Sequence, residues 1–227
     1  MKFKLAAAIL FICFVTIAVS AQEPGKTNGE PAGQSKKVEP KYSAKDYEDI
    51  VAKLKNGDTN VDFTMLRMGF VETREYSFRG SDKKAVEKFS APFNDKKFKD
   101  ALKEAEKFIE KNYVDANAHY VAYNSAKEIK DDAKAEFHKA VLLGLLNSIK
   151  NGNDGLSAKS PFKVITVDEE YTMLRFLGYK VMSQSLNHID GHTFDVFTAA
   201  DNKTNEKVTI YFNIDVVWAA ETKLFGG

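Results

Sequence analysis

The segment His188-Ile189-Asp190-Gly191-His192 carries the side chains of this chain that are best suited to chemistry. In an extended segment, residues 188, 190 and 192 would project to one side, as a metal site with two histidines and one carboxylate requires. An open position on such a metal could activate water for hydrolysis. The alternative is a hairpin turn, because Asp-Gly between two strand-like runs is a strong turn signal. A turn accounts for Gly191, which a metal site does not, and it would scatter the three side chains.

Two adjacent carboxylates, Glu169 and Glu170, could form an acid–base pair. Successive helix residues diverge by about 100°, so the two side chains cannot easily share one substrate. Helix capping and the helix dipole account for Glu169 without a catalytic role. The catalytic candidates are therefore Glu170 and His192, acting in a hydrolase.

Arg67 and Arg175 are the candidates for binding an anionic ligand, because each follows a leucine on a predicted amphipathic helix. A guanidinium group can hold a carboxylate or phosphate through two parallel hydrogen bonds. The alternatives are an ion pair with a carboxylate such as Asp195, or a side-chain stem that lies along the surface.

The other aromatic and histidine residues fit packing as well as chemistry. Several aromatic side chains could line a groove for a carbohydrate or peptide, although a core would use them in the same way. These are Tyr76, Tyr171, Tyr179, Tyr211 and Trp218. His119 and His138 lie on different predicted helices and lack metal-ligand spacing. No Walker loop, dinucleotide fingerprint, zincin motif or nucleophile elbow occurs, and the sequence implies no cofactor.

Residues 1–21 have the order of regions of a secretory signal peptide: a basic start, an apolar run and small residues at the end. The apolar run, residues 5–19, is shorter than the roughly 20 residues of a spanning helix. We therefore expect export to the periplasm or beyond a bacterial cell, with no membrane span after cleavage. The single cysteine, Cys13, lies inside this run, so the mature chain would have no disulfide.

The composition argues against a nucleic-acid partner. The chain has 33 basic and 32 acidic side chains, and their signs are interleaved. No overall field would attract a polyanion. Residues 22–42 are rich in Gly, Pro, Lys and Glu, and we expect them to form a flexible linker.

Residues 43–225 are predicted to form one domain, helical over 43–150 and mainly β over 160–218. The expected N-terminal caps of its helices are Ser43, Asp62, Asn94, Asp115 and either Asp131 or Asp132. Residues 73–92 are predicted to be irregular. The last two helices should form a tetratricopeptide-like antiparallel hairpin, with small residues such as Gly144 allowing close approach. One and a half such repeats fit, fewer than the roughly three of a solenoid.

The pattern changes to alternation after the Gly152 to Gly155 loop. Strands are predicted over 162–166, 179–186, 192–199 and 207–214, with a short helix that begins in a Thr166–Glu169 capping box. A small antiparallel sheet packed on the helices gives an α+β fold.

The chain also resembles a bacterial secreted family known as domain of unknown function 4919. Near the front the resemblance lies in Asp62-Phe63, Leu66-Arg67 and Tyr76. Further on it lies in Gly152 to Gly155, Phe162, Glu169-Glu170-Tyr171, Gln184, Asp190-Gly191-His192, Asp195 and Tyr211-Phe212-Asn213-Ile214. The resemblance implies one domain over roughly 43–218 and an export route, but no reaction.

Three functions remain open for such a domain. The first is a non-catalytic module that binds a protein or peptide of the cell envelope. The second is an envelope hydrolase, metal-dependent or not, that uses His188, Asp190 and His192. The third is a structural envelope protein that associates with itself.

Overall fold

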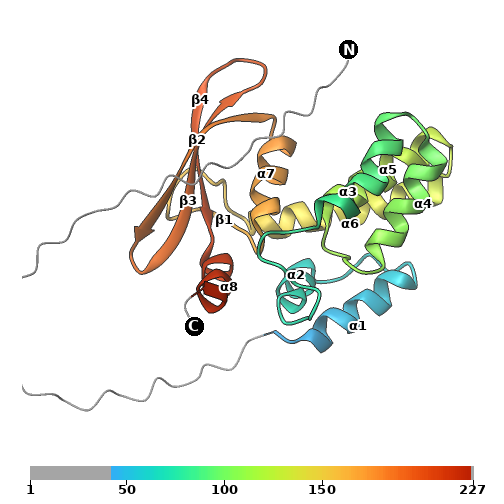
Figure 1. The fold of residues 1–227 in the computed structure, drawn as a ribbon, viewed down its shortest axis with the longest axis horizontal. Helices are drawn as coiled ribbons and strands as arrows, with labels where there is room; N and C mark the ends of the chain where they lie inside the picture. Colours follow the sequence, from blue (N-terminus) through green and yellow to red (C-terminus); the bar gives the residue numbers. More distant parts are fainter. Residues whose placement is uncertain (1–41, 226–227) are drawn as a thin grey trace, which may run out of the picture. The chain divides into compact units, whose positions relative to one another are not determined.

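A computed structural model describes residues 42–225 (Figure 1). The expected signal peptide lies outside the described residues, as does the expected linker except for Tyr42. The described part has eight helices and one four-stranded mixed sheet, which confirms the α+β class. The helices are α1 (Ala44–Lys55), α2 (Phe63–Phe70), α3 (Lys83–Asn94), α4 (Phe98–Ile109), α5 (Ala116–Glu128), α6 (Asp132–Lys150), α7 (Val167–Phe176) and α8 (Asp215–Phe225). The strands are β1 (Phe162–Lys163), β2 (Tyr179–Ile189), β3 (His192–Asp201) and β4 (Lys207–Asn213).

Local capping sets the ends of the first helices. Ser43 and Asp46 form the expected capping box, in which each side chain accepts a hydrogen bond from the other residue's backbone N–H. Asp62 caps α2 by accepting from the backbone N–H groups of Thr64 and Met65. No helix within residues 42–225 has the length and apolar character needed to cross a membrane.

Helix α3 corrects two sequence-based expectations. Residues 73–92 were expected to be irregular, but Asp82 caps a helix that starts at Lys83. Its apolar stripe is thin, and Phe89 is its one fully buried side chain. Asn94 is the last residue of α3 rather than the cap of α4, so that predicted cap is wrong. The sequence did not predict this helix because its apolar residues are sparse and it contains Pro92. Its stability comes from packing on α4.

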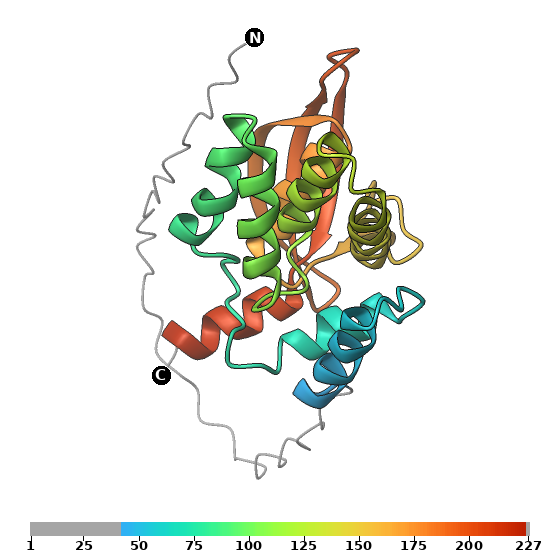
Figure 2. The same cartoon turned by 90° about the vertical axis from the view of Figure 1, so that its right-hand side faces the viewer.

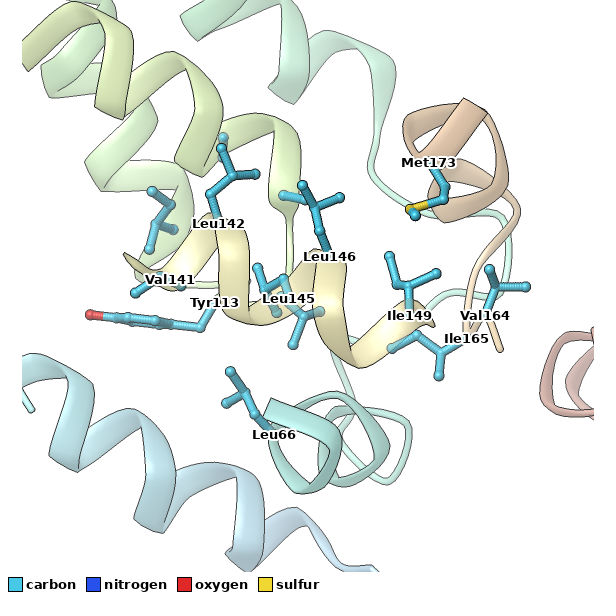
Figure 3. Packing of buried hydrophobic residues seen from close by; sticks show 14 of the residues in the cluster. Leu66, Tyr113, Val141, Leu142, Leu145, Leu146, Ile149, Val164, Ile165 and Met173 are labelled. Carbon is cyan, nitrogen blue, oxygen red and sulfur yellow. The ribbon is translucent and has the colours of Figure 1, made fainter. Parts of the chain in front are cut away.

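Helix α6 connects the helical half to the rest of the fold. Its buried side chains form one cluster with Leu66 of α2 and Met173 of α7 (Figure 3). Asp131 caps this helix, as expected. Gly144 was expected to let α5 and α6 approach, but its open position accommodates Phe63 of α2. A Cβ there would lie 2.2 Å from the Phe63 ring.

The sheet has the strand order β1-β4-β3-β2. Strands β2, β3 and β4 are antiparallel, whereas β1 runs parallel to β4 through the pairs Phe162 with Phe212 and Lys163 with Asn213. The expected small antiparallel sheet is thus formed by β2, β3 and β4, and the two-residue β1 adds a parallel pairing at one edge. A correction concerns Trp218, which lies on α8, a helix that the period-two pattern did not predict.

Helices cover one face of the sheet. Figures 1 and 2 show α3 to α7 on the same side of the strands. Cross-strand partners share a face, and the ring of Tyr171 on α7 contacts Phe197 with centroids 5.6 Å apart. We call this the inner face; it includes Gln184, Leu186 and Asp195 by register. The opposite, outer face carries exposed Ser185 and Thr209.

Candidate functional site: a carboxyl cluster beside strand β2

The segment 188–192 forms the tight turn between β2 and β3. Ile189 pairs with His192, and the two residues between them have positive φ, +51° at Asp190 and +80° at Gly191. These angles suit a two-residue hairpin turn of type I′. His188 Nδ1 lies 3.2 Å from Thr193 Oγ1, and its ring packs on Trp218. His192 Nδ1 instead lies 2.6 Å from an Asp215 oxygen.

The two predicted metal-ligating histidines thus have different partners. No group of three or more His, Cys, Asp or Glu side chains within residues 42–225 is arranged to hold a metal ion. A metal at His188, Asp190 and His192 would require the hairpin to rearrange. The site therefore stays a prediction that metal analysis can test.

Arg67 is fully occupied by contacts inside the protein. Its Nε and Nη2 atoms donate to the two Glu169 oxygens at 2.8 and 2.6 Å. Nη2 also donates to the Lys163 carbonyl, and Nη1 donates to Ser148 Oγ. The Arg67 side chain is 2% exposed. Ligand binding by Arg67 stays a prediction, and it would require this buried ion pair to open.

Arg175, the second predicted ligand-binding arginine, lies elsewhere. Its Nη2 atom donates to the Asn117 amide oxygen of α5. Its guanidinium lies 5.9 Å from the Phe176 ring centroid and is attracted by Asp115 and Asp168. The structure therefore does not bring Arg67 and Arg175 together as one anion site.

Glu170 faces the sheet and is the most unusual carboxyl group of the described residues. Its side chain is completely buried, and neither carboxyl oxygen accepts a hydrogen bond from any donor of residues 42–225. Burial raises the pKa of Glu170 well above its usual value, and the nearby Asp195 charge raises it further. A protonated Glu170 can donate to Asp195, whose own pKa is also raised, chiefly by burial. The two groups are therefore best described as one pair that shares a proton.

A hydrogen-bonded chain connects this pair to the surface. The Tyr171 hydroxyl donates to Gln184 Oε1 at 3.0 Å, and Gln184 Nε2 donates to Asp195 Oδ2 at 2.7 Å. Glu221 of α8 lies close enough to Asp195 for its charge to raise the Asp195 pKa. We call Glu170, Asp195 and Glu221 the carboxyl cluster. None of its members forms an ion pair with a Lys, Arg or His of residues 42–225.

The carboxyl cluster lies next to an open sheet edge. Strand β2 has 11 residues and is last in the strand order, so one side of its backbone pairs with β3 and no other strand of residues 42–225 pairs with the opposite side. A register shift at Met182 is its main irregularity. Met182 and Leu186 are 52% and 46% exposed. Lys180 is its one Lys, Arg, Asp or Glu residue.

A second buried titratable pair, which the sequence did not reveal, joins α5 and α6. The Nδ1 atoms of His119 and His138 lie 3.1 Å apart, and His119 Nε2 contacts the Tyr113 carbonyl at 3.2 Å. Burial, with a smaller contribution from the His138 charge, lowers the pKa of His119 to about 3. The predicted hairpin was the available signal, because antiparallel helices bring residues on either side of their turn together.

His138 also borders a cavity of about 450 Å³. Its lining includes Glu106, Glu110, Tyr113, Lys134 and Phe137. Lys134 already pairs with Glu106 at 2.7 Å, so the charged groups of this cavity are largely satisfied by one another. The carboxyl cluster differs because no Lys, Arg or His in the described part of the chain forms an ion pair with it.

Sequence comparison defines the family but no activity. No curated protein and no solved structure matches the chain. The sequence model of one family, described as Domain of unknown function (DUF4919), matches residues 34–223. This match includes Arg67, Glu169, Glu170, Gln184 and Asp195, so the whole candidate site lies within the family's domain. The chain therefore belongs to the DUF4919 family.

Proposed function

We propose that this protein is an exported, non-catalytic module of the cell envelope that binds an extended segment of another protein as a further strand along β2. The observation that carries the proposal is the open edge of β2, 11 residues long and last in the sheet. Unpaired N–H and C=O groups on such an edge are a template for pairing with another chain.

The composition of β2 supports this role. Proteins commonly protect a sheet edge with charged residues, proline or a short strand. Here, residues 183–187 contain no charged residue and no proline. The bulge at Met182 disturbs the first part of the strand and leaves the regular pairing from Ser183 to Ile189. That stretch is long enough for strand addition, whose affinity comes from main-chain hydrogen bonds.

The test is selection of binding peptides from a displayed library, followed by hydrogen exchange of the complex. Bound peptides should slow exchange at residues 183–189. Ser183→Lys should lower their affinity by about tenfold or more, because a lysine at an edge opposes further pairing. Thr209→Lys is the matched control: Ser183 and Thr209 both pair with Thr198, but Thr209 lies on the interior strand β4.

Two results would overturn this proposal. Peptides that protect another surface, or no binding peptides at all, would remove β2 as the binding site. Concentration-dependent protection of β2 without any peptide would instead identify a second copy as the occupant, as for a self-associating envelope protein.

A second candidate, a hydrolase, has one observation in its favour. The His192 ring is 60% exposed and contacts Asp215, so the carboxylate could orient an exposed histidine as a general base. Metal content before and after the double substitution His188→Ala and His192→Ala tests the metal-dependent form. Stoichiometric metal that this double substitution abolishes would favour the hydrolase over the binding module.

A further inference from the structure

We propose that the segment bound at β2 carries a lysine or arginine on the inner face, and that its cationic group pairs with the Asp195 and Glu221 carboxylates. This inference rests on the proposed function and names the chemistry of the partner.

Charge complementarity is the first support. Glu170 faces Asp195, and the charge of Glu221 acts on Asp195 from α8. The neighbouring Glu169 has Arg67 as its cation, whereas no cation of the described residues pairs with these three. Buried charged groups are ordinarily paired. A cation from outside would complete the carboxyl cluster as Arg67 completes Glu169.

The burial of Glu170 is the second support, and it does not depend on which cations pair with the carboxyl cluster. Its two oxygens are buried and unpartnered as a carboxylate, and the group is directed towards Asp195. Asp195 is 9% exposed, and Glu221 is half-buried. Within the carboxyl cluster, Glu170 is fully enclosed, whereas solvent or a bound side chain can contact Asp195 and Glu221.

The geometry of strand addition selects a long side chain. Neighbouring strands lie about 4.8 Å apart, so the backbone of an added strand would lie about 10 Å from β3, which carries Asp195. Lysine and arginine have stems of three or four methylene groups and can lie along apolar surface while the charged end reaches a partner. Leu186 provides that surface, because it is the direct cross-strand partner of Asp195 and is 46% exposed.

Binding of the cation should also displace the shared proton. A positive charge beside carboxyl groups favours their ionised form. The Glu170–Asp195 pair would therefore lose part of its proton when a basic peptide binds near neutral pH. A bound peptide without the basic residue would leave the proton in place.

The experiment compares β2-binding peptides with variants in which the inner-face basic residue is norleucine. Norleucine should weaken binding by about tenfold, as expected for loss of hydrogen bonds to charged groups. Calorimetry in two buffers of different ionisation enthalpy should show proton release with the basic peptide and none with norleucine. Glu221→Gln and Asp195→Asn should each reduce the preference, whereas Glu206→Gln, in the β3–β4 turn, should not.

The outcomes separate this inference from the proposed function. Peptides that bind β2 with no preference for a basic residue, and without proton release, would overturn the inference and leave strand addition intact. Absence of any peptide at β2 would overturn both. The peptide variants decide the question even if Asp195→Asn fails to fold, because they leave the protein unchanged.

Discussion

Glu169 and Glu170 are adjacent on α7, yet the fold buries them in opposite ways. Glu169 turns towards the helical half, where Arg67 binds both of its oxygens and Ile165 donates its backbone N–H. Glu170 turns towards the sheet, where it faces another carboxyl group, Asp195. One carboxyl group has a cation as its partner, and the other has an acid. The same residue type therefore acquires different chemistry from its tertiary partner alone.

The His119–His138 pair extends this comparison to buried bases. Burial opposes the charged form of both groups, because it lowers the pKa of His119 and raises the pKa of Glu170. Folding therefore opposes charge in both pairs, but the two pairs should respond to pH in opposite directions.

Removing the cation from the paired side should have the largest effect. Arg67→Met would leave Glu169 buried without its partner, and we expect a loss of about 3–5 kcal/mol in the free energy of unfolding. Urea unfolding at neutral pH measures this loss. Arg67→Met combined with Glu169→Gln should recover much of it, because no buried charge then remains. A double variant as unstable as Arg67→Met would show that packing, rather than charge, dominates.

The histidine pair should make the protein sensitive to acid. The His119 pKa is about 3 in the folded protein and 6.5 normally, so between these values the unfolded chain binds a proton that the folded protein cannot bind. Stability from this group should therefore fall as pH drops below about 6.5, by roughly 3 kcal/mol at about pH 4.5. His119→Gln should flatten this part of the pH profile of unfolding, whereas His188→Gln, on exposed β2, should not. An unchanged slope would contradict the buried neutral state.

The Glu170–Asp195 pair should make the free energy of unfolding decrease as pH rises, by less than the histidine pair decreases it in acid. Its raised pKa means that the unfolded chain releases a proton above about pH 4.5 while the folded protein retains it. Stability from this pair is thus complete below that pH and declines as pH rises towards the folded pKa. Glu170→Gln removes the titration, so the stability of this variant relative to the natural chain should increase as pH rises above about 4.5 towards the raised folded pKa. A constant difference would show that Glu170 is already ionised in the folded protein.

Tyr171→Phe should have the smallest effect, because it removes one exposed end of the chain that reaches Asp195. We expect a loss of about 1 kcal/mol or less in urea unfolding, the usual value of one hydrogen bond. Tyr211→Phe, on the other face of the sheet, is the control. A shift of the carboxyl-pair titration in Tyr171→Phe would show that Gln184 orients Asp195 through this bond.

Local chemistry in the sequence determined much of the secondary structure. Ser43, Asp62, Asp115 and Asp131 cap the helices that they were expected to cap. Three strands lie where they were predicted, although burial alternates clearly only along β4, and Asp190-Gly191 makes the turn between β2 and β3. These features depend on residues within one or two turns of each other, so a single sequence contains the necessary information.

The tertiary structure alone decided the partners. The expected alternative that an arginine pairs with a carboxylate holds for Arg67, but its partner is Glu169, 102 positions away, rather than Asp195. Three further features depend on which surfaces pack together: the parallel pairing of β1 with β4, the existence of α3 and α8, and the raised pKa of Glu170. Sequence spacing locates charged residues along an element, but burial and distant neighbours determine whether each becomes an ion pair, a neutral acid or an open site.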